Sequence, residues 1–150
     1  MVSRKRRTAV VLDTNVLVGA LKSRFQGGPN QRVLRLWLER RRLQLIVSDE
    51  LIAEYLDVFS DVLGLKDSTC AAWRERFERD GRTSVVQLGR RFAESRDSDD
   101  NLLLAVAHAG NAEWLITNDK DLLELPEQFQ RSLPFTVARP SEFLKAFEDS

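Results

Sequence analysis

The sequence predicts one α/β domain built around a mostly parallel sheet. Short β-branched and apolar runs, typical of strands buried on both faces, alternate along the chain with stretches of helical periodicity. The chain has no internal repeat and no long linker, and 150 residues is the length of one ordinary domain. In sheets of this class, functional sites form at the carboxyl ends of the strands.

The start of the chain predicts a strand and two helices. Thr8–Leu12 (TAVVL) is a β-branched and apolar run, as expected for a buried strand. A short helix is expected at Asn15–Lys22, before the break QGGP at 26–29. Asn30 is the expected N-cap of the next helix, in which apolar residues recur at helical spacing.

The middle of the chain predicts two strands and two helices. Leu43–Val47 (LQLIV) and Ser84–Leu88 (SVVQL) have the composition of strands. Ser48 is the expected N-cap of a helix whose apolar residues recur with helical periodicity through 51–62. Another helix is expected at Asp67–Arg79.

The last third of the chain completes the alternation. An acidic turn at Arg96–Asn101 (RDSDDN) leads into an apolar helix at Leu102–Ala109, and Glu113–Thr117 (EWLIT) is the next strand. The remaining elements are a helical turn, a strand and a last helix, expected at Leu122–Leu125, at Phe135–Val137 and from Ser141.

The composition excludes several classes of protein. With 43% hydrophobic residues, 31% charged residues and one cysteine, the chain is not a disulfide scaffold, a collagen or a disordered tail. No apolar run approaches the roughly 20 residues of a membrane helix, and the start of the chain lacks the pattern of a signal peptide. We therefore expect a cytoplasmic protein without membrane contact.

The charges are segregated along the chain although the net charge is zero. Residues 1–45 contain 11 basic and 2 acidic residues, a net charge of +9, and the remaining residues contain 12 basic and 21 acidic ones, a net charge of −9. This division suits a protein that attracts a polyanion and holds cations, although a solvated surface also explains it. Residues 1–7 are expected to form a basic N-terminal arm ahead of a single domain at 8–150.

Carboxylates gather where strands end or helices begin. Asp13 follows the first strand, and a carboxylate so near a core needs a hydrogen-bonding partner or a metal, with a helix cap as the alternative. Glu54 lies at the margin of the apolar face of its helix, where a surface glutamate is the alternative. Asp97, Asp99 and Asp100 crowd one helix start, where they repel one another unless a cation is present.

Asp119 and Asp121 add two carboxylates after the strand that ends at Thr117. Oxygen ligands without a cluster of cysteine or histidine select Mg²⁺ or Mn²⁺ over zinc. Magnesium is usually held by one or two carboxylates together with substrate phosphates, so the expected substrate carries phosphate. A metal in such a site activates water for in-line attack on phosphorus.

Four segments together resemble the acidic motifs of the PIN-domain family: VVLDTN at 10–15, SDELIAEYLDVF at 48–59, RDSDDNLLLAVAHAG at 96–110 and WLITNDKDLL at 114–123. The resemblance extends from about residue 8 to residue 125 and is greatest to VapC-like toxins of type II toxin–antitoxin pairs. It implies a three-layer α/β/α fold and a Mg²⁺- or Mn²⁺-dependent endoribonuclease. It also implies a cognate antitoxin as partner, and dimers are common among the similar proteins.

The resemblance assigns residues to the site. The implied catalytic and metal-binding residues are Asp13, Glu54, Asp100 and Asp119, with Asp121 as a further ligand. The implied supporting residues are Asn15, which would orient Asp13, Thr117 and Asp99. Related sequences commonly have proline in place of Ser98, Lys-Phe in place of Leu102 and Leu103, and glycine in place of Asn118. Asp100 is preferred to Asp99 as the ligand because Asn101 follows it, as in the relatives.

Arginines surround the second predicted helix and are the expected RNA contacts, with an acidic protein as the alternative partner. They are Arg32, Arg35, Arg40, Arg41 and Arg42. The alternative function for the whole chain is a catalytically inert PIN-like domain that binds RNA or protein. The presence of all four candidate carboxylates weakens this alternative.

Overall fold

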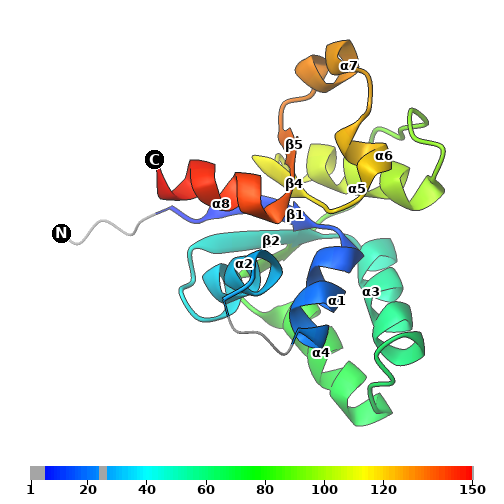
Figure 1. Ribbon diagram of the computed structural model, residues 1–150. Helices are drawn as coiled ribbons and strands as arrows, with labels where there is room; N and C mark the ends of the chain where they lie inside the picture. The colour runs from blue at the N-terminus through cyan, green and yellow to red at the C-terminus, as the bar shows by residue number, and fades with distance from the viewer. Residues whose placement is uncertain (1–5, 24–26, 150) are drawn as a thin grey trace.

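A five-stranded parallel sheet forms the centre of the molecule, with strand order β3-β2-β1-β4-β5 (Figure 1). The computed structural model describes residues 6–23 and 27–149. The strands are β1 (Thr8–Leu12), β2 (Leu43–Val47), β3 (Thr83–Val85), β4 (Trp114–Ile116) and β5 (Thr136–Ala138). Both central strands are apolar on both faces, since Val10, Val11 and Leu12 in β1 and Leu45 in β2 are fully buried.

Helices cover both faces of this sheet, which makes the three-layer α/β/α arrangement. The helices are α1 (Thr14–Lys22), α2 (Pro29–Leu38), α3 (Asp49–Asp61), α4 (Asp67–Arg79), α5 (Ser98–Ala109), α6 (Lys120–Leu123), α7 (Glu127–Ser132) and α8 (Pro140–Glu148). On one face α2 packs against α1, β2 and α8, whereas α5 packs against β1, β2 and β4 (Figure 1). No helix in the described part of the chain is long and apolar enough to span a membrane.

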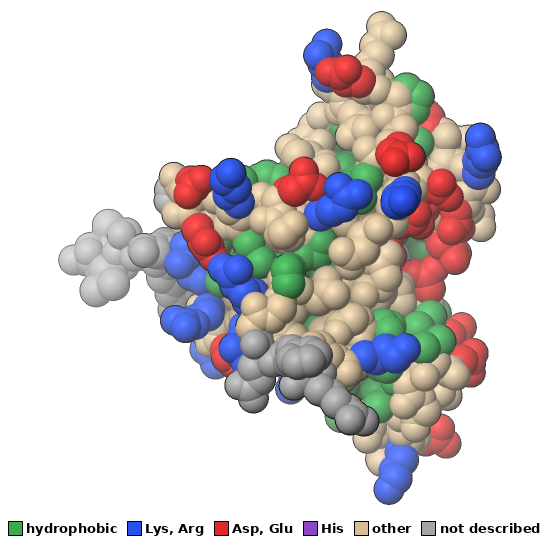
Figure 2. Space-filling view, in the orientation of Figure 1, with side chains coloured by type: hydrophobic (Ala, Val, Ile, Leu, Met, Phe, Trp, Pro, Cys, Tyr) green, Lys and Arg blue, Asp and Glu red, His purple; other side chains and the backbone are tan. Residues whose placement is uncertain are grey.

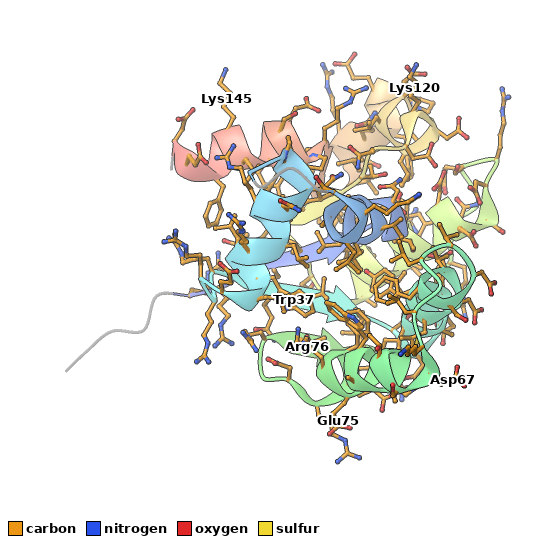
Figure 3. All side chains as sticks on the ribbon, turned by 60° about the horizontal axis from the view of Figure 1, so that its bottom comes forward. Trp37, Asp67, Glu75, Arg76, Lys120 and Lys145 are labelled. Carbon is orange, nitrogen blue, oxygen red and sulfur yellow. The ribbon has the colours of Figure 1, made fainter. Side chains whose placement is uncertain are left out.

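Aromatic side chains fill the layer between α2, α3 and α4. Trp37 is fully buried and stacks on Phe77 of α4, with ring centroids 6.0 Å apart (Figure 3). Phe77 also contacts Tyr55 and Phe59 of α3 at centroid distances of 5.1 Å and 6.3 Å. These contacts hold the middle and the end of α3, the helix that carries Glu54, against α4.

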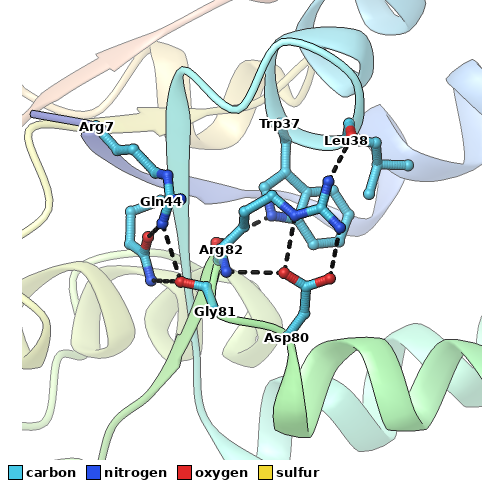
Figure 4. A network of polar contacts seen from close by, with 7 residues as sticks. All are labelled: Arg7, Trp37, Leu38, Gln44, Asp80, Gly81 and Arg82. Atoms are coloured by element: carbon cyan, nitrogen blue, oxygen red, sulfur yellow. Dashed lines mark hydrogen bonds and ion pairs between the residues drawn. The ribbon is translucent and has the colours of Figure 1, made fainter. Parts of the chain in front are cut away.

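A polar network ties together the amino ends of three strands (Figure 4). Asp80 accepts hydrogen bonds from the backbone and side-chain nitrogens of Arg82, the shortest being 2.6 Å from Nη2, and Arg82 also donates to the carbonyl of Leu38 at the end of α2. The Trp37 indole donates to the Arg82 carbonyl at 3.0 Å. Arg7 donates to the Gln44 side chain and to the Gly81 carbonyl, each at 3.1 Å.

Most predicted elements are confirmed, and the differences lie in β3, at helix starts and in the last third. The strand predicted at Ser84–Leu88 covers only Thr83–Val85. Because Pro29 occupies the first helical position, α2 begins before Asn30, and its N-cap is Gly28. The acidic turn forms the first turn of α5, where Asp97 is the N-cap and accepts from the Asp99 N–H at 2.9 Å.

Three smaller corrections concern the helices near the end of the chain. The helical turn predicted at Leu122–Leu125 is α6 and spans Lys120–Leu123, since the Asp119 carboxylate caps it by accepting from the Asp121 N–H. The last helix begins at Pro140 rather than at Ser141. Helix α7 was not predicted, because Glu127–Ser132 has no buried residue to give it an apolar periodicity.

Two sequence predictions fall partly on residues that the structure leaves undescribed. Residues 1–5 of the predicted basic arm and Gln26 of the predicted break lie outside the described residues. Within the described part, Arg6 pairs with Glu113 at 2.8 Å, and Arg7 joins the network at the amino ends of the strands.

Candidate metal centre

Three aspartates from three elements meet at the carboxyl edge of the sheet. Asp13 follows β1, Asp119 follows β4, and Asp100 lies in the first turn of α5. One carboxylate oxygen of each lies within 4.8 Å of the others. The parallel register brings the two strand ends together, since Leu12 pairs with Ile116 and the Asp13 N–H donates to the Ile116 carbonyl at 2.9 Å.

Two side chains fix the orientation of Asp13. Its Oδ2 accepts a hydrogen bond of 2.6 Å from the Thr117 hydroxyl and one of 3.1 Å from the Asn15 amide. Burial raises the pKa of Asp13, the Thr117 hydroxyl and the backbone of Asn15 and Thr14 lower it by hydrogen bonding, and the charge of Asp119 raises it. The predicted orienting role of Asn15 thus has a direct contact in the structure.

Thr117 connects two of the three aspartates. It is fully buried, and while its hydroxyl donates to Asp13, its oxygen accepts from the Asp119 N–H at 2.9 Å. The Asp119 carboxylate accepts from the Asp121 N–H at 2.9 Å. Asp121 itself is exposed, and its side chain lies outside the group of three, although the sequence analysis placed it among the ligands.

Asp100 is the most deeply buried carboxylate of the group, with 2% of its surface exposed. Burial raises its pKa to about 7, and the charges of Asp119, Asp97 and Asp13 act in the same direction. The Ser95 hydroxyl opposes this shift by donating to Oδ2 at 3.0 Å. The preference for Asp100 over Asp99 agrees with this placement.

Ser95 is a site residue that sequence reasoning missed. Besides its bond to Asp100, its hydroxyl accepts from the Asp97 N–H at 3.2 Å, and its backbone exchanges hydrogen bonds with the Asn101 side chain at 2.9 Å and 3.0 Å. A serine two residues before a capping aspartate is the one signal for it, since such hydroxyls commonly close turns. Ser95 therefore orients Asp100 from the loop that precedes α5.

Glu54 and Asp99 lie beside the three-aspartate group and face each other. The Thr14 hydroxyl donates to Glu54 Oε2 at 2.6 Å. Burial raises the pKa of Glu54 to about 7, and the interactions with Asp99 and the charge of Asp13 raise it as well. Glu54 is thus near the cluster, but only Asp13, Asp100 and Asp119 satisfy the tight spacing among the described residues.

Tyr55 attaches α3 to the end of β1. Its buried hydroxyl donates to the carbonyl of Leu12, the residue before Asp13. Burial raises the pKa of the Tyr55 hydroxyl well above its ordinary value, so it remains a hydrogen-bond donor. The sequence analysis assigned Tyr55 only to the apolar face of its helix.

A chain of amide side chains extends from the aspartates to the start of α2. Asn15 Oδ1 accepts from the Asn118 N–H at 3.2 Å and from the Asn118 side chain at 3.4 Å. The Asn118 amide also donates to Asn30 Oδ1 at 3.1 Å. Asn118 and Asn30 are 88 residues apart, so no local pattern indicates this contact.

The ligand atoms of this edge suit a hard divalent cation. All three close side chains are carboxylates, and their burial beside one another favours protonation unless a cation compensates their charge. Neutral hydroxyl and amide donors from Thr117, Asn15 and Ser95 hold the carboxylates in place, as outer partners of metal ligands commonly do. Oxygen ligands of this kind fit Mg²⁺ or Mn²⁺.

The predicted RNA-contacting arginines lie on α2 and in the segment that leads from it to β2. Arg32 and Arg35 lie on α2, and Arg40, Arg41 and Arg42 form the connection to β2. Figure 2 shows basic side chains gathered around α2 and α8, and acidic side chains gathered on the opposite side, around α5 and α6. The two halves of the chain also meet through their charges, since Arg6 pairs with Glu113 and Arg32 with Glu148, so the separation in space is partial.

Comparison with known proteins gives the family. A family model of the PIN domain matches residues 9–121, which include Asp13, Glu54, Asp100 and Asp119. No curated protein gives a significant match to the sequence. Because the family model covers most of its 150 residues, the chain belongs to the PIN-domain family.

Proposed function

We propose that this protein is a Mg²⁺- or Mn²⁺-dependent endoribonuclease that hydrolyses phosphodiester bonds of RNA. Membership of the PIN-domain family indicates a nuclease-type function. The observation that carries the metal dependence is the meeting of Asp13, Asp100 and Asp119 within 4.8 Å at the carboxyl edge of the sheet. No Cys or His accompanies them in this cluster, so the ligand set favours a hard cation.

The residues of the site would have different roles in such a reaction. Asp13, Asp100 and Asp119 would hold the cation, which supplies an activated water and neutralises charge on the phosphate. Thr117, Asn15 and Ser95 keep the carboxylate oxygens turned toward the cluster. Glu54 has one oxygen engaged by Thr14 and a pKa raised to about 7, which suits a group that accepts a proton near neutral pH.

We further propose that the protein is the toxin of a toxin–antitoxin pair. The support is the likeness of its four acidic motifs to those of such toxins, and the exposure of Asp99 and Asp121 beside the site, where a partner can reach them. Expression of the protein should stop growth of a bacterial host, and the small protein encoded next to it should restore growth. Normal growth of a host that makes the folded, RNA-cutting protein would contradict the toxin role.

Cleavage of a labelled mixed RNA by the purified protein tests the central proposal. We expect cutting with Mg²⁺ or Mn²⁺ and none with a chelator, and a loss of roughly 100-fold or more in Asp13→Asn and Asp100→Asn, because outer partners of metal ligands alone are worth about 10- to 100-fold. Asp57→Asn, an exposed change on the helix that carries Glu54, is the matched control and should cut normally.

Three outcomes separate the proposals. Equal cutting by wild type and Asp13→Asn would show that Asp13 is not a metal ligand. Cutting in the presence of chelator would remove the metal dependence. A folded wild type that cuts no RNA with any metal would favour the alternative, a PIN-like domain that binds RNA or protein without cleaving it.

A further inference from the structure

A groove of about 890 Å³ lies between α2 and α8, away from the aspartate cluster. Its apolar lining comes from Leu36 of α2 and from Leu144 and Phe147 of α8. The charged residues that line it are Arg32, Arg35, Arg40, Arg42 and Glu148. Figure 2 shows basic and hydrophobic side chains side by side where α2 and α8 meet.

The groove carries an excess of positive charge over an aromatic surface. Arg32 forms an ion pair with Glu148, but no carboxylate among the described residues pairs with Arg35, Arg40 or Arg42. The Arg42 guanidinium lies 5.0 Å from the centre of the Phe147 ring. Guanidinium groups along a groove can bind the phosphates of a strand, and positively charged grooves are what proteins that bind single-stranded nucleic acid use to follow its backbone.

Helix α2 connects this groove with the aspartate cluster. At its start, Asn30 accepts a hydrogen bond from Asn118, the residue before Asp119. At its other end, Arg40 and Arg42 follow the last helical residue, Leu38. A helix of this length spans about 15 Å, at roughly 1.5 Å per residue. An RNA strand lying along α2 would reach both the aspartates and the groove. An acidic protein segment could bind in the groove without extending to the aspartates.

We propose that the groove between α2 and α8 binds the single-stranded RNA that flanks the cleavage site. This proposal rests on the proposed ribonuclease function and adds a second contact region to it. The phosphates contact Arg35, Arg40 and Arg42. Arg41 is exposed but does not line the groove.

Binding of a labelled single-stranded RNA of about 20 nucleotides, measured in chelator so that nothing is cut, tests the groove directly. Arg40→Gln should weaken binding about four-fold at 0.15 M salt and lower the salt dependence by about one contact, since each phosphate contact on a single strand contributes a slope of about 0.7. Circular dichroism confirms that each variant is folded.

Two variants serve as controls of equal charge. Arg41→Gln removes the neighbouring arginine, and Lys145→Gln removes a cation of α8 that points away from the molecule (Figure 3). Both should bind RNA like the wild type. If Arg41→Gln and Arg40→Gln weaken RNA binding equally, only the overall positive charge matters. This result would overturn the proposal that the groove binds RNA.

Cleavage of substrates of two lengths separates this proposal from the proposed function. A dinucleotide whose one phosphodiester lies at the aspartates leaves the groove empty, so Arg40→Gln should cut it like the wild type but cut the long RNA with a raised KM. If the wild type binds RNA but cuts neither substrate, the proposed ribonuclease function is wrong, and the proposal that the groove binds RNA is kept. If Arg40→Gln binds and cuts the long RNA normally, the proposal that the groove binds RNA is wrong, and the proposed ribonuclease function is unaffected. A change from dimer to monomer in Arg40→Gln, with RNA affinity unchanged, would identify a protein interface and overturn the proposal.

Discussion

At the scale of single residues, Thr117 links two of the three aspartates of the candidate metal centre. Its hydroxyl is the hydrogen-bond partner of both Asp13 and the Asp119 backbone. Thr117→Val keeps the shape of the side chain but removes both bonds, so we expect metal affinity to fall roughly 10- to 100-fold. The unpaired Asp119 N–H should also cost about 1–3 kcal/mol of unfolding free energy.

Titration of the protein with Mn²⁺ by calorimetry measures the loss of affinity. Thr117→Ser is the matched control, because it keeps the hydroxyl and should restore most of the affinity. If Thr117→Val binds Mn²⁺ as tightly as Thr117→Ser, the hydroxyl has no role in orienting Asp13.

The sequence could predict the carboxylates that neighbouring strands bring together. It could predict fewer of the side chains that hold those carboxylates in place. Asp13 and Asp119 follow from a general rule, because neighbouring parallel strands end at the same edge of a sheet. Ser95 depends on how the loop before α5 folds back over Asp100, and local spacing carries little information about such a loop. The contact of Asn118 with Asn30 depends on the packing of α2 beside the edge, which a pattern of single residues does not encode.

At the scale of elements, the network of Asp80 and Arg82 joins α2, α4 and β3. The two side chains are largely buried, with 19% and 17% exposed, and Arg82 lowers the pKa of Asp80 well below its ordinary value. Asp80→Ala should therefore lower the unfolding free energy at pH 7 by about 2–3 kcal/mol, as expected for hydrogen bonds to a charged group. Urea denaturation measures this loss.

The pH dependence of the same change follows from the depressed pKa of Asp80. A carboxyl with a lowered pKa in the folded state stabilises the protein above its unfolded pKa, and this stabilisation is lost as the pH falls below about 4. The difference between wild type and Asp80→Ala should shrink in that range. Glu75→Ala, which removes an exposed ion pair with Arg79, is the control and should change stability little at any pH.

The elements whose observed bounds are the predicted ones are β1, β2 and α4. In β1 and β2, buried apolar runs end at polar residues. Helix α4 buries only Phe77, so its bounds follow instead from Asp67 in its first turn and from Gly81 beyond its end. The end of β3 and the whole of α7 escaped prediction, since their side chains are largely exposed and tertiary contacts fix their limits. For the same reason the start of α5 lies inside the acidic run, where Asp97 caps it.

At the scale of the whole molecule, the carboxylate cluster opposes folding when no metal is bound. The pKa values of Glu54 and Asp100 are raised to about 7 in the folded protein, whereas in the unfolded chain they return to about 4. Between these values the folded state keeps protons that the unfolded state has lost. Stability in chelator therefore falls as the pH rises from about 4 to 7.

Asp100→Asn isolates this contribution. Without metal, the variant should melt at a higher temperature than the wild type at pH 8, and most of this advantage should be lost at pH 4, near the pKa of the carboxyl in the unfolded chain. With Mn²⁺ the wild type should gain more stability than the variant, because an ion at 100 times its dissociation constant stabilises the protein that binds it by about 2.7 kcal/mol. This gain should be greatest at pH 8, since protons compete with the metal for the carboxylates. Melting curves of both proteins in chelator and in Mn²⁺ at the two pH values measure these differences. A wild type that gains stability from Mn²⁺ no more than Asp100→Asn does would show that Asp100 does not bind the metal.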